Sequence, residues 1–294
     1  MREFEYIAPR SLHQAIDLLA RADGKGKLLA GGTDLIAQMK EKRQSPDLVI
    51  DAKHIPELNV LSFDQAQGLR LGAAVSCARV AGLGAVRERY HALAEACALI
   101  GSVQIQNRAA VGGNFCNAAP SADTVPAVLV YGGKVILAGT KGRRELPAEE
   151  FFIAPGQTAL ENGEILIEID LPTPPHQSAA AYLRFIPREE MDIAVAGVAA
   201  CLKLSADGSR CERARIALAA VAPTPVRAYE AEKFLVGKPA NSTVFADAGE
   251  MAAKSANAIS DVRGSAAYRI ELVKVLTRRS LRRAWQRVTG DATD

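Results

Sequence analysis

The stretch LLAGGTDLIAQMK, residues 28–40, places three small residues between an apolar run and a helical one. Leu28 and Leu29 are typical of the end of a buried strand, and Thr33 or Asp34 can accept hydrogen bonds from the free N–H groups of a following helix. A glycine pair at such a turn permits positive φ and lets another molecule approach the backbone closely. Because the first N–H groups and the dipole of a helix favour an anion, the stretch predicts a phosphate-binding turn, with an ordinary tight turn as the alternative.

The residues on either side of this turn alternate between strand and helix patterns. A short strand pattern opens the chain, and Ser11 with Gln14 forms a capping box for the helix that follows. Two further strand patterns occupy residues 27–32 and 46–53, with a helix pattern between them. Together these patterns predict a compact α/β unit in the order strand–helix–strand–helix–strand.

A second glycine stretch, AAVGGNFCNAAPSAD at residues 109–123, lies in a second unit of strand and helix patterns, whose first helix Ser76 is expected to cap. It is expected to interrupt regular structure for about fifteen residues. Asn114 carries donors and an acceptor and tolerates the left-handed backbone of tight loops. Facing each other, the glycine pairs of the two stretches can hold a pyrophosphate through backbone N–H groups, although neither has the spacing of a known nucleotide-binding motif.

The segment PTPPHQSAA, residues 172–180, is the clearest linker, because it holds three prolines within four positions. Beyond it two strand patterns flank a turn at Asp207-Gly208, and three helical segments follow up to Val288. This order predicts a smaller α/β domain in the last part of the chain.

Composition and charge are those of an ordinary globular protein. The chain has 294 residues, a length that suits about two domains. Of these residues 49% are hydrophobic and 23% are charged. A net charge of +3 with 5% aromatic residues argues against a nucleic-acid interface. The five scattered cysteines fit neither a disulfide framework nor an iron–sulfur motif, and neither a signal peptide nor a transmembrane segment is recognisable. We therefore expect a cytoplasmic protein.

Stretches spread over nearly the whole chain carry a resemblance to a known family. They are FEYIAPRSLHQAIDLL (4–19), LLAGGTDLIAQMK (28–40), DLVIDAKHIPEL (47–58), LGAAVSCARV (71–80), AAVGGNFCNAAPSADTVPAVL (109–129), FFIAPGQTAL (151–160), EILIEIDLP (164–172), REEMDIAVAGVAA (188–200) and ALAAVAPTPVRAYEAEKFLVGK (217–238). With these stretches in this order, the sequence resembles the FAD-binding medium subunits of the molybdenum hydroxylases, relatives of xanthine dehydrogenase, carbon monoxide dehydrogenase and 4-hydroxybenzoyl-CoA reductase.

The resemblance implies an α+β fold in two domains. The first is a two-lobed FAD-binding domain (PCMH / vanillyl-alcohol-oxidase-like), expected over residues 1–177 with lobes 1–55 and 56–177. The second is a smaller α/β C-terminal domain, a sheet packed by helices, expected over residues 178–294.

The resemblance also implies residues that bind FAD without a covalent bond. The two glycine stretches would line its pyrophosphate and ribityl chain, and Ser102 would approach the adenosine or phosphate part. Asp123 would hydrogen-bond the cofactor, Leu166 would supply a backbone contact, and Arg184 would place a positive charge near the flavin ring, where many relatives carry lysine. The full set is Leu28, Leu29, Ala30, Gly31, Gly32, Thr33, Asp34, Leu35, Ile36, Ser102, Ala110, Val111, Gly112, Gly113, Asn114, Asp123, Leu166 and Arg184.

The function that the resemblance implies is electron transfer within a larger enzyme. FAD would take electrons from the 2Fe–2S clusters of a small subunit and pass them to an external acceptor, while hydroxylation occurs at the molybdopterin of a large subunit. The expected partners are these two subunits, in a dimer of heterotrimers. Residues 114–150 lack the cysteine-rich insertion of the benzoyl-CoA-reducing branch, so no metal is expected on this chain.

Two other functions stay open at this point. A self-sufficient FAD oxidase would need a substrate domain with an acid or a base, and the C-terminal part shows no such cluster; a flavin-free structural subunit would not need intact glycine pairs. The basic run Arg278 to Arg287 favours a solvated helix face first, docking onto an acidic partner subunit second and nucleic-acid binding third. Valine at Gly31 or Gly112 is expected to expel FAD and leave much of the fold, because its side chain would fill the space of a phosphate.

Overall fold

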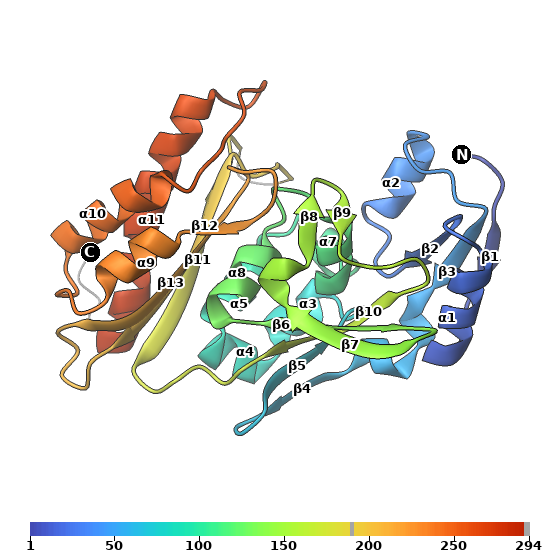
Figure 1. The fold of residues 1–294 in the computed structure, drawn as a ribbon, viewed down its shortest axis with the longest axis horizontal. Coiled ribbons are helices and arrows are strands. Elements are labelled where there is room, and N and C mark those ends of the chain that lie inside the picture. Colours follow the sequence, from blue (N-terminus) through green and yellow to red (C-terminus); the bar gives the residue numbers. More distant parts are fainter. Residues whose placement is uncertain (189–190, 291–294) are drawn as a thin grey trace.

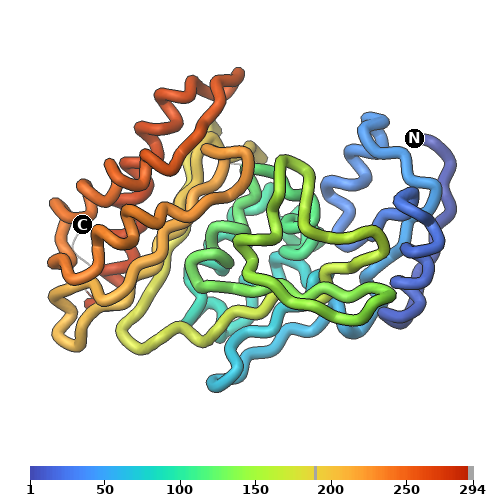
Figure 2. Tube along the Cα trace, viewed as in Figure 1, coloured from blue at the N-terminus to red at the C-terminus, as the bar shows by residue number. Residues whose placement is uncertain are grey.

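The computed structural model describes residues 1–188 and 191–290. The chain folds into three parts in a row, each built on one main sheet (Figure 1). The N-terminal lobe and the C-terminal domain lie at opposite ends of the elongated molecule with the second lobe between them, as the chain trace also shows (Figure 2). The predicted mixture of helices and sheets is confirmed. Glu189 and Glu190 of the stretch 188–200 lie outside the described residues.

The N-terminal lobe contains the predicted strand–helix–strand–helix–strand unit, folded as a parallel sheet in the order β1-β3-β2. Its elements are β1 (Glu5–Ile7), α1 (Leu12–Arg21), β2 (Gly26–Leu29), α2 (Leu35–Lys40), β3 (Leu48–Asp51), η1 (Ala52–His54) and η2 (Pro56–Asn59). The Ser11 half of the predicted capping box is confirmed, because the Ser11 hydroxyl accepts a hydrogen bond from the Gln14 N–H at 3.3 Å. The other half is wrong, because Gln14 Oε1 accepts from the Arg10 N–H at 3.4 Å and not from the Ser11 N–H. At α2, Asp34 occupies the N-cap position but makes no capping hydrogen bond with its side chain.

The second lobe is an antiparallel sheet in the order β4-β5-β10-β6-β7, with the helices inserted between β5 and β6. Its elements are β4 (Leu61–Asp64), β5 (Gly68–Gly72), α3 (Cys77–Gly82), α4 (Gly84–Arg89), α5 (His91–Ala98), α6 (Val103–Gln106), α7 (Val111–Asn117), α8 (Thr124–Tyr131), β6 (Lys134–Gly139), β7 (Gly142–Pro147), η3 (Ala148–Glu150), β8 (Phe152–Ala154), β9 (Gln157–Thr158) and β10 (Ile165–Leu171). The predicted cap of α3 by Ser76 is confirmed.

The second glycine stretch is not the long irregular segment that the sequence predicts. Helix α7 begins at Val111, so the Gly-Gly-Asn segment forms its first turn, and irregular structure begins only at Ala118, whose φ is 47°. Glycine and asparagine have low helix propensity, which explains the wrong prediction. Val111 and Phe115, four positions apart and both fully buried, supply the packing that holds the helix in place.

The C-terminal domain is an antiparallel sheet in the order β11-β12-β13-β14, followed by helices. Its elements are β11 (Ser178–Phe185), β12 (Ala196–Leu204), β13 (Cys211–Ala219), β14 (Val226–Arg227), α9 (Tyr229–Leu235), α10 (Ser242–Ala253) and α11 (Ala266–Thr289). The predicted turn at Asp207-Gly208 joins β12 to β13, and Gly208 adopts the positive φ of 73° that this turn requires.

Both faces of the C-terminal sheet are covered. Helices α9 and α11 pack on one face, with α10 packed against both of them, and α5 and α8 of the second lobe pack on the other face. For this reason Tyr182, Ala199 and Ala217 belong to the hydrophobic core of the two N-terminal lobes, while their neighbours along the strands belong to the core under α11. This shared core holds β11 against the second lobe. No helix in the described part of the chain is long and apolar enough to cross a membrane.

Candidate functional site

The turn that contains Gly31 lies directly against the backbone that leads into α7. A Cβ atom built on Gly31 would stand 2.1 Å from the carbonyl oxygen of Arg108 and 2.8 Å from the Cα of Ala109. The Gln38 side-chain amide in α2 also donates a hydrogen bond to Asn117 Oδ1 at the end of α7, at 2.9 Å. The two glycine stretches, about eighty positions apart in sequence, are therefore neighbours, as the pyrophosphate hypothesis requires.

The two glycines of the second stretch have different surroundings. A Cβ atom on Gly112 would stand 2.5 Å from both the Cβ and the carbonyl oxygen of Ala73, so this position is closed by the chain itself. A Cβ atom on Gly113 would meet only the Cβ of Ala110, at 4.0 Å. Of this pair, Gly113 is the one whose missing side chain leaves open space.

This difference corrects the expectation for valine at Gly31 and Gly112. Both positions are occupied by neighbouring backbone, so a side chain there would displace the protein's own atoms. The reason given for the substitution, a clash with a phosphate and a largely intact fold, is wrong for these two residues. Gly32 is needed for a different reason: its φ of 78° is the left-handed conformation that the strand-to-helix turn requires.

A buried carboxylate lies at the start of α8, facing β11. Asp123 Oδ1 accepts a hydrogen bond from the Tyr182 hydroxyl at 2.6 Å, and its Oδ2 pairs with Arg184 Nη1 at 2.6 Å. The side chains of Asp123 and Arg184 are only 9% and 5% exposed. Burial raises the pKa of the Asp123 carboxyl, while Arg184 and Tyr182 act to lower it. Burial also raises the pKa of the Tyr182 hydroxyl well above its usual range, so this group remains a donor.

The guanidinium of Arg184 has one nitrogen without a hydrogen-bond partner among the described residues. Its Nη1 bonds to Asp123, and its Nη2 donates to the carbonyl oxygen of Leu99 at 2.7 Å, just before the loop that carries Ser102. The buried Nε atom has no hydrogen-bond partner within the described ranges 1–188 and 191–290. A buried N–H without an acceptor is costly in a protein interior, so this atom is where an acceptor group from a ligand would be favourable.

Asn114 and Leu166 belong to the same neighbourhood. The Asn114 side-chain oxygen accepts hydrogen bonds from the hydroxyl of Thr124 at 2.7 Å and from its N–H at 3.4 Å, which fixes the amide beside Asp123. Leu166 lies in β10 at a register shift against β6. The next residue in that strand accepts a hydrogen bond from the N–H of Ala73, the residue that closes Gly112.

All the predicted site positions therefore lie along one connected set of elements. The turn before α2, the loop before α6, the first turn of α7, the start of α8, the start of β10 and the end of β11 are linked through the bonds and close approaches given above. Within the first stretch, Leu28 to Ile36, every residue keeps part of its surface accessible.

Two residues outside the predicted set support the site. Tyr182 is 1% exposed and holds Asp123, and its own N–H donates to Glu95 Oε2 at 2.8 Å. Tyr182 could have been found, because it precedes Arg184 by two positions and side chains at i and i+2 share one face of a strand. The role of Glu95 could not be predicted from the sequence, because its partners lie in the distant C-terminal domain.

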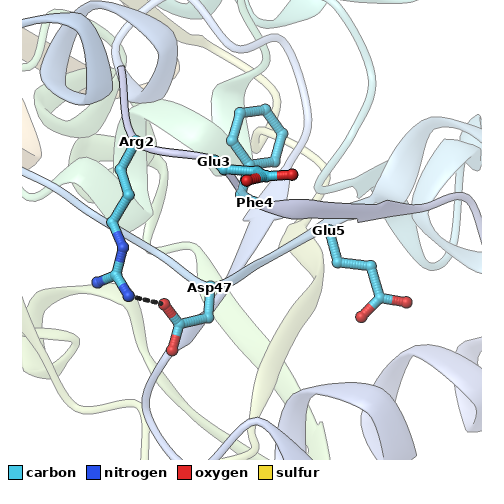
Figure 3. Close-up of a pocket in the computed structure, with 5 residues that line it drawn as sticks. All are labelled: Arg2, Glu3, Phe4, Glu5 and Asp47. Atoms are coloured by element: carbon cyan, nitrogen blue, oxygen red, sulfur yellow. Dashed lines mark ion pairs between the residues drawn. The ribbon is translucent and has the colours of Figure 1, made fainter.

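A separate hollow lies at the N-terminus, outside this set. Arg2, Glu3, Phe4, Glu5 and Asp47 surround it, and Figure 3 shows Arg2 reaching over to Asp47. The Arg2–Asp47 ion pair spans 3.4 Å between side chains that are 69% and 45% exposed. Exposed ion pairs of this kind contribute little, and none of the predicted site residues lines the hollow.

Two family models cover nearly the whole chain. The model described as "FAD binding domain in molybdopterin dehydrogenase" matches residues 2–174, and the model described as "CO dehydrogenase flavoprotein C-terminal domain" matches residues 181–284. The chain belongs to the FAD-binding medium subunits of the molybdenum hydroxylase family. The resemblance found in the sequence and the two-part fold are thereby confirmed, and so is an FAD-binding domain in an oxidoreductase subunit.

Curated relatives of this family match over almost their full length. The carbon monoxide dehydrogenase medium chain of Hydrogenophaga pseudoflava is 32% identical over 97% of this chain and 98% of its own. The putative xanthine dehydrogenase FAD-binding subunit of Escherichia coli (strain K12) is 31% identical over 95% of both chains.

Solved structures of the family share the fold. The carbon monoxide dehydrogenase of Hydrogenophaga pseudoflava that lacks the Mo-pyranopterin moiety has a chain that matches with a TM-score of 0.93 at 33% identity, covering 97% of this chain and 98% of that one. A chain of quinoline 2-oxidoreductase from Pseudomonas putida 86 matches with a TM-score of 0.90 at 30% identity, over 97% and 98%.

Proposed function

We propose that this chain holds FAD non-covalently where its two N-terminal lobes meet the C-terminal domain, and relays electrons from an iron–sulfur partner to an external acceptor. FAD supplies the redox chemistry when bound, and the protein supplies binding, orientation and electrostatics. The observation that carries the proposal is the buried Arg184 Nε, which has no acceptor in the part of the chain that the structure describes, within a cluster that also contains the open position at Gly113.

The residues present fit a dinucleotide of this kind. Gly31 lets the first turn lie against Arg108 and Ala109, Gly112 lets α7 lie against Ala73, and Gly113 leaves room for a phosphate. The first N–H groups of α7 have no acceptor within the helix, so they can donate to such a group. We assign the pyrophosphate to this turn and to the turn at residues 28–36, and an adenosine or phosphate contact to Ser102.

Arg184 serves this site better as a donor than as a free charge. Its pairing with Asp123 at 2.6 Å balances most of its positive charge, while Leu99 fixes the plane of the guanidinium. We propose that Nε–H donates to a polar edge of the flavin ring, with Asp123 and Tyr182 keeping the guanidinium in place. Lysine carries all its donors on one nitrogen, so it lacks the planar fork with which Arg184 reaches Asp123 and Leu99 through separate nitrogens.

The partners follow from the family. We propose a large molybdopterin subunit and a small subunit with two 2Fe–2S clusters, arranged as a dimer of heterotrimers in the cytoplasm. The relatives named as medium chains and FAD-binding subunits support such an assembly. Within this chain we assign residues 1–177 to FAD and residues 178–294 to a domain that supplies Arg184.

The test is a visible absorption spectrum of the chain purified together with co-expressed partner subunits, followed by acid release and mass identification of the chromophore. We expect about one FAD per chain, and we expect acid to release it intact because it is not bound covalently. A colourless chain inside an intact complex would make the glycine turns purely structural. Substrate oxidation by the isolated chain would favour a self-sufficient oxidase instead.

A further inference from the structure

Arg269 is a buried arginine near the N-terminal end of α11, in the C-terminal domain. Its side chain is only 4% exposed, although helix dipoles favour positive charges at the other end of a helix. Its Nη2 atom donates to Asp261 Oδ1 at 2.7 Å. Its Nη1 atom donates to two backbone carbonyl oxygens, of Val195 at 2.6 Å and of Ala220 at 3.0 Å. A buried charge needs such acceptors, and both carbonyl groups lead to the proposed FAD site.

The first carbonyl group lies beside the strand pair that carries Arg184. The N–H of Val195 donates to the carbonyl oxygen of Phe185 at 2.9 Å, and Phe185 directly follows Arg184 in β11. Strand β12 begins at the next residue, Ala196, which is the register partner of Phe185. Arg269 therefore fixes the end of the β11–β12 ladder at the level of Arg184.

The second carbonyl group leads to the loop that carries Asp123. The N–H of Ala220 donates at 2.7 Å to the carbonyl oxygen of Pro120, which lies in the loop between α7 and α8 together with Asp123. Ala220 has a φ of 65°, a left-handed conformation that is unfavourable for residues other than glycine. Strained backbone persists only where its surroundings hold it in place. Here both backbone polar groups of Ala220 are bonded, one to the loop and the other to Arg269.

We propose that Arg269 is a positioning residue for the FAD site, because one of its nitrogens holds the backbone on both sides of the Asp123–Arg184 pair. The inference rests on the proposed function, in which the Nε–H of Arg184 donates to the flavin. Asp123 comes from the second lobe and Arg184 from the C-terminal domain, so their geometry depends on how the domain sits on the lobe. Arg269 fixes the strand end and the loop relative to each other through Val195 and Ala220. A displacement of about 1 Å at a positioned group can change its effect ~100-fold.

The experiment compares Arg269→Lys with Arg227→Lys in complexes purified with co-expressed partner subunits. Both changes keep the positive charge and remove the planar fork of arginine. Arg227 is a matched control, because it lies in the same domain with a side chain only 13% exposed, and its ion pairs go to Glu232 and Glu149.

Two quantities are measured on each complex. They are the rate at which FAD is released on dilution, followed by flavin fluorescence, and the visible circular dichroism of the bound flavin, which reports the geometry around the ring. We expect Arg269→Lys to release FAD about tenfold faster and to alter the dichroism spectrum. We expect Arg227→Lys to stay within about twofold of the wild-type release rate, with an unaltered spectrum.

A second pair of variants tests the same link should Arg269→Lys fail to fold. The φ of 65° at Ala220 is an outlier for a β-branched residue, whereas glycine adopts it freely. We expect Ala220→Val to release FAD faster and to alter the dichroism spectrum, and Ala220→Gly to behave as the wild type.

Two results would overturn the proposal. One is equal release of FAD from Arg269→Lys and Arg227→Lys or, in the second pair, from Ala220→Val and Ala220→Gly. The other is faster release with a wild-type dichroism spectrum, which would make Arg269 purely structural. The FAD content of the wild type separates this inference from the proposed function. A wild-type complex without FAD would overturn both, whereas full FAD content with either of the two results would overturn this inference alone.

Discussion

The second lobe meets its two neighbours through contacts of opposite kinds. Toward the N-terminal lobe, backbone lies on backbone, with Gly31 against Arg108 and Ala109 and no space for a single carbon atom. Toward the C-terminal domain, the apolar contact between α5, α8 and the sheet encloses a buried charge pair, in which Asp123 accepts bonds from Arg184 and Tyr182. The first contact is limited by volume and the second by charge.

This difference teaches how each contact should respond to change. A contact limited by volume tolerates changes of pH and salt but not an added methyl group. A buried charge pair tolerates small changes of shape but not the loss of one partner, because the remaining charge is then buried without compensation. The predictions below change one property at a time, beginning with the largest expected effect.

Asp123→Asn should cause the largest loss of stability. The substitution keeps the shape of the side chain but removes the charge that compensates Arg184, whose side chain is 5% exposed. We expect the free energy of unfolding to fall by about 3–5 kcal/mol, measured by urea denaturation. A loss below about 1 kcal/mol, the value of an exposed pair, would mean that this contact is not limited by charge.

Gly31→Ala should come next. The new methyl group would stand 2.1 Å from the Arg108 carbonyl oxygen, so the two lobes must move apart. We expect a loss of about 1–3 kcal/mol that does not change between low and high salt. Gly112→Ala, against Ala73, should behave in the same way, and a strong salt dependence in either variant would contradict a contact limited by volume.

Gly113→Ala should change stability in the opposite direction. This position lies within α7 and its missing side chain faces open space, so alanine replaces a poor helix former without a clash. We expect a gain of up to about 1 kcal/mol in the FAD-free chain, together with weaker FAD binding. The measurements are thermal denaturation and FAD content per chain. Full FAD content in this variant would remove Gly113 from the proposed phosphate site.

Asp170→Asn should have the smallest effect and is the matched control for Asp123→Asn. Burial, and then the neighbouring Glu168, raise the pKa of Asp170 to about 7. A carboxyl with a raised pKa in the folded state stabilises the protein below its ordinary pKa, and this stabilisation is lost as the pH rises through about 7.

Because asparagine does not titrate, the variant should lose less stability than the wild type between about pH 4 and pH 8. The charges that face Asp170 are Glu168 on its own strand, Lys134 on β6 and Arg70 on β5, and all three stay in place in the variant. Parallel pH profiles of the melting temperature for the two proteins would show that Asp170 does not titrate in this range.

Much of the fold could be predicted from local patterns. The first α/β unit, the cap of α1 by Ser11, the cap of α3 by Ser76 and the turn at Asp207-Gly208 depend on residues within a few positions of one another. Such interactions are strong enough to show in composition and spacing. The exception is α7, where the low helix propensity of Gly112 and Gly113 is outweighed by the packing of buried side chains.

By itself, the sequence determined most of the order of the elements and the family, and it supplied the set of residues that we propose for the cofactor site. Only the tertiary structure decided which glycines are closed by the chain and which one is open, and that Asp123 pairs with Arg184 across 61 positions. The reason is physical. Glycines of one motif are identical until packing places neighbours beside them, and a buried charge has no partner until two distant segments meet in the core.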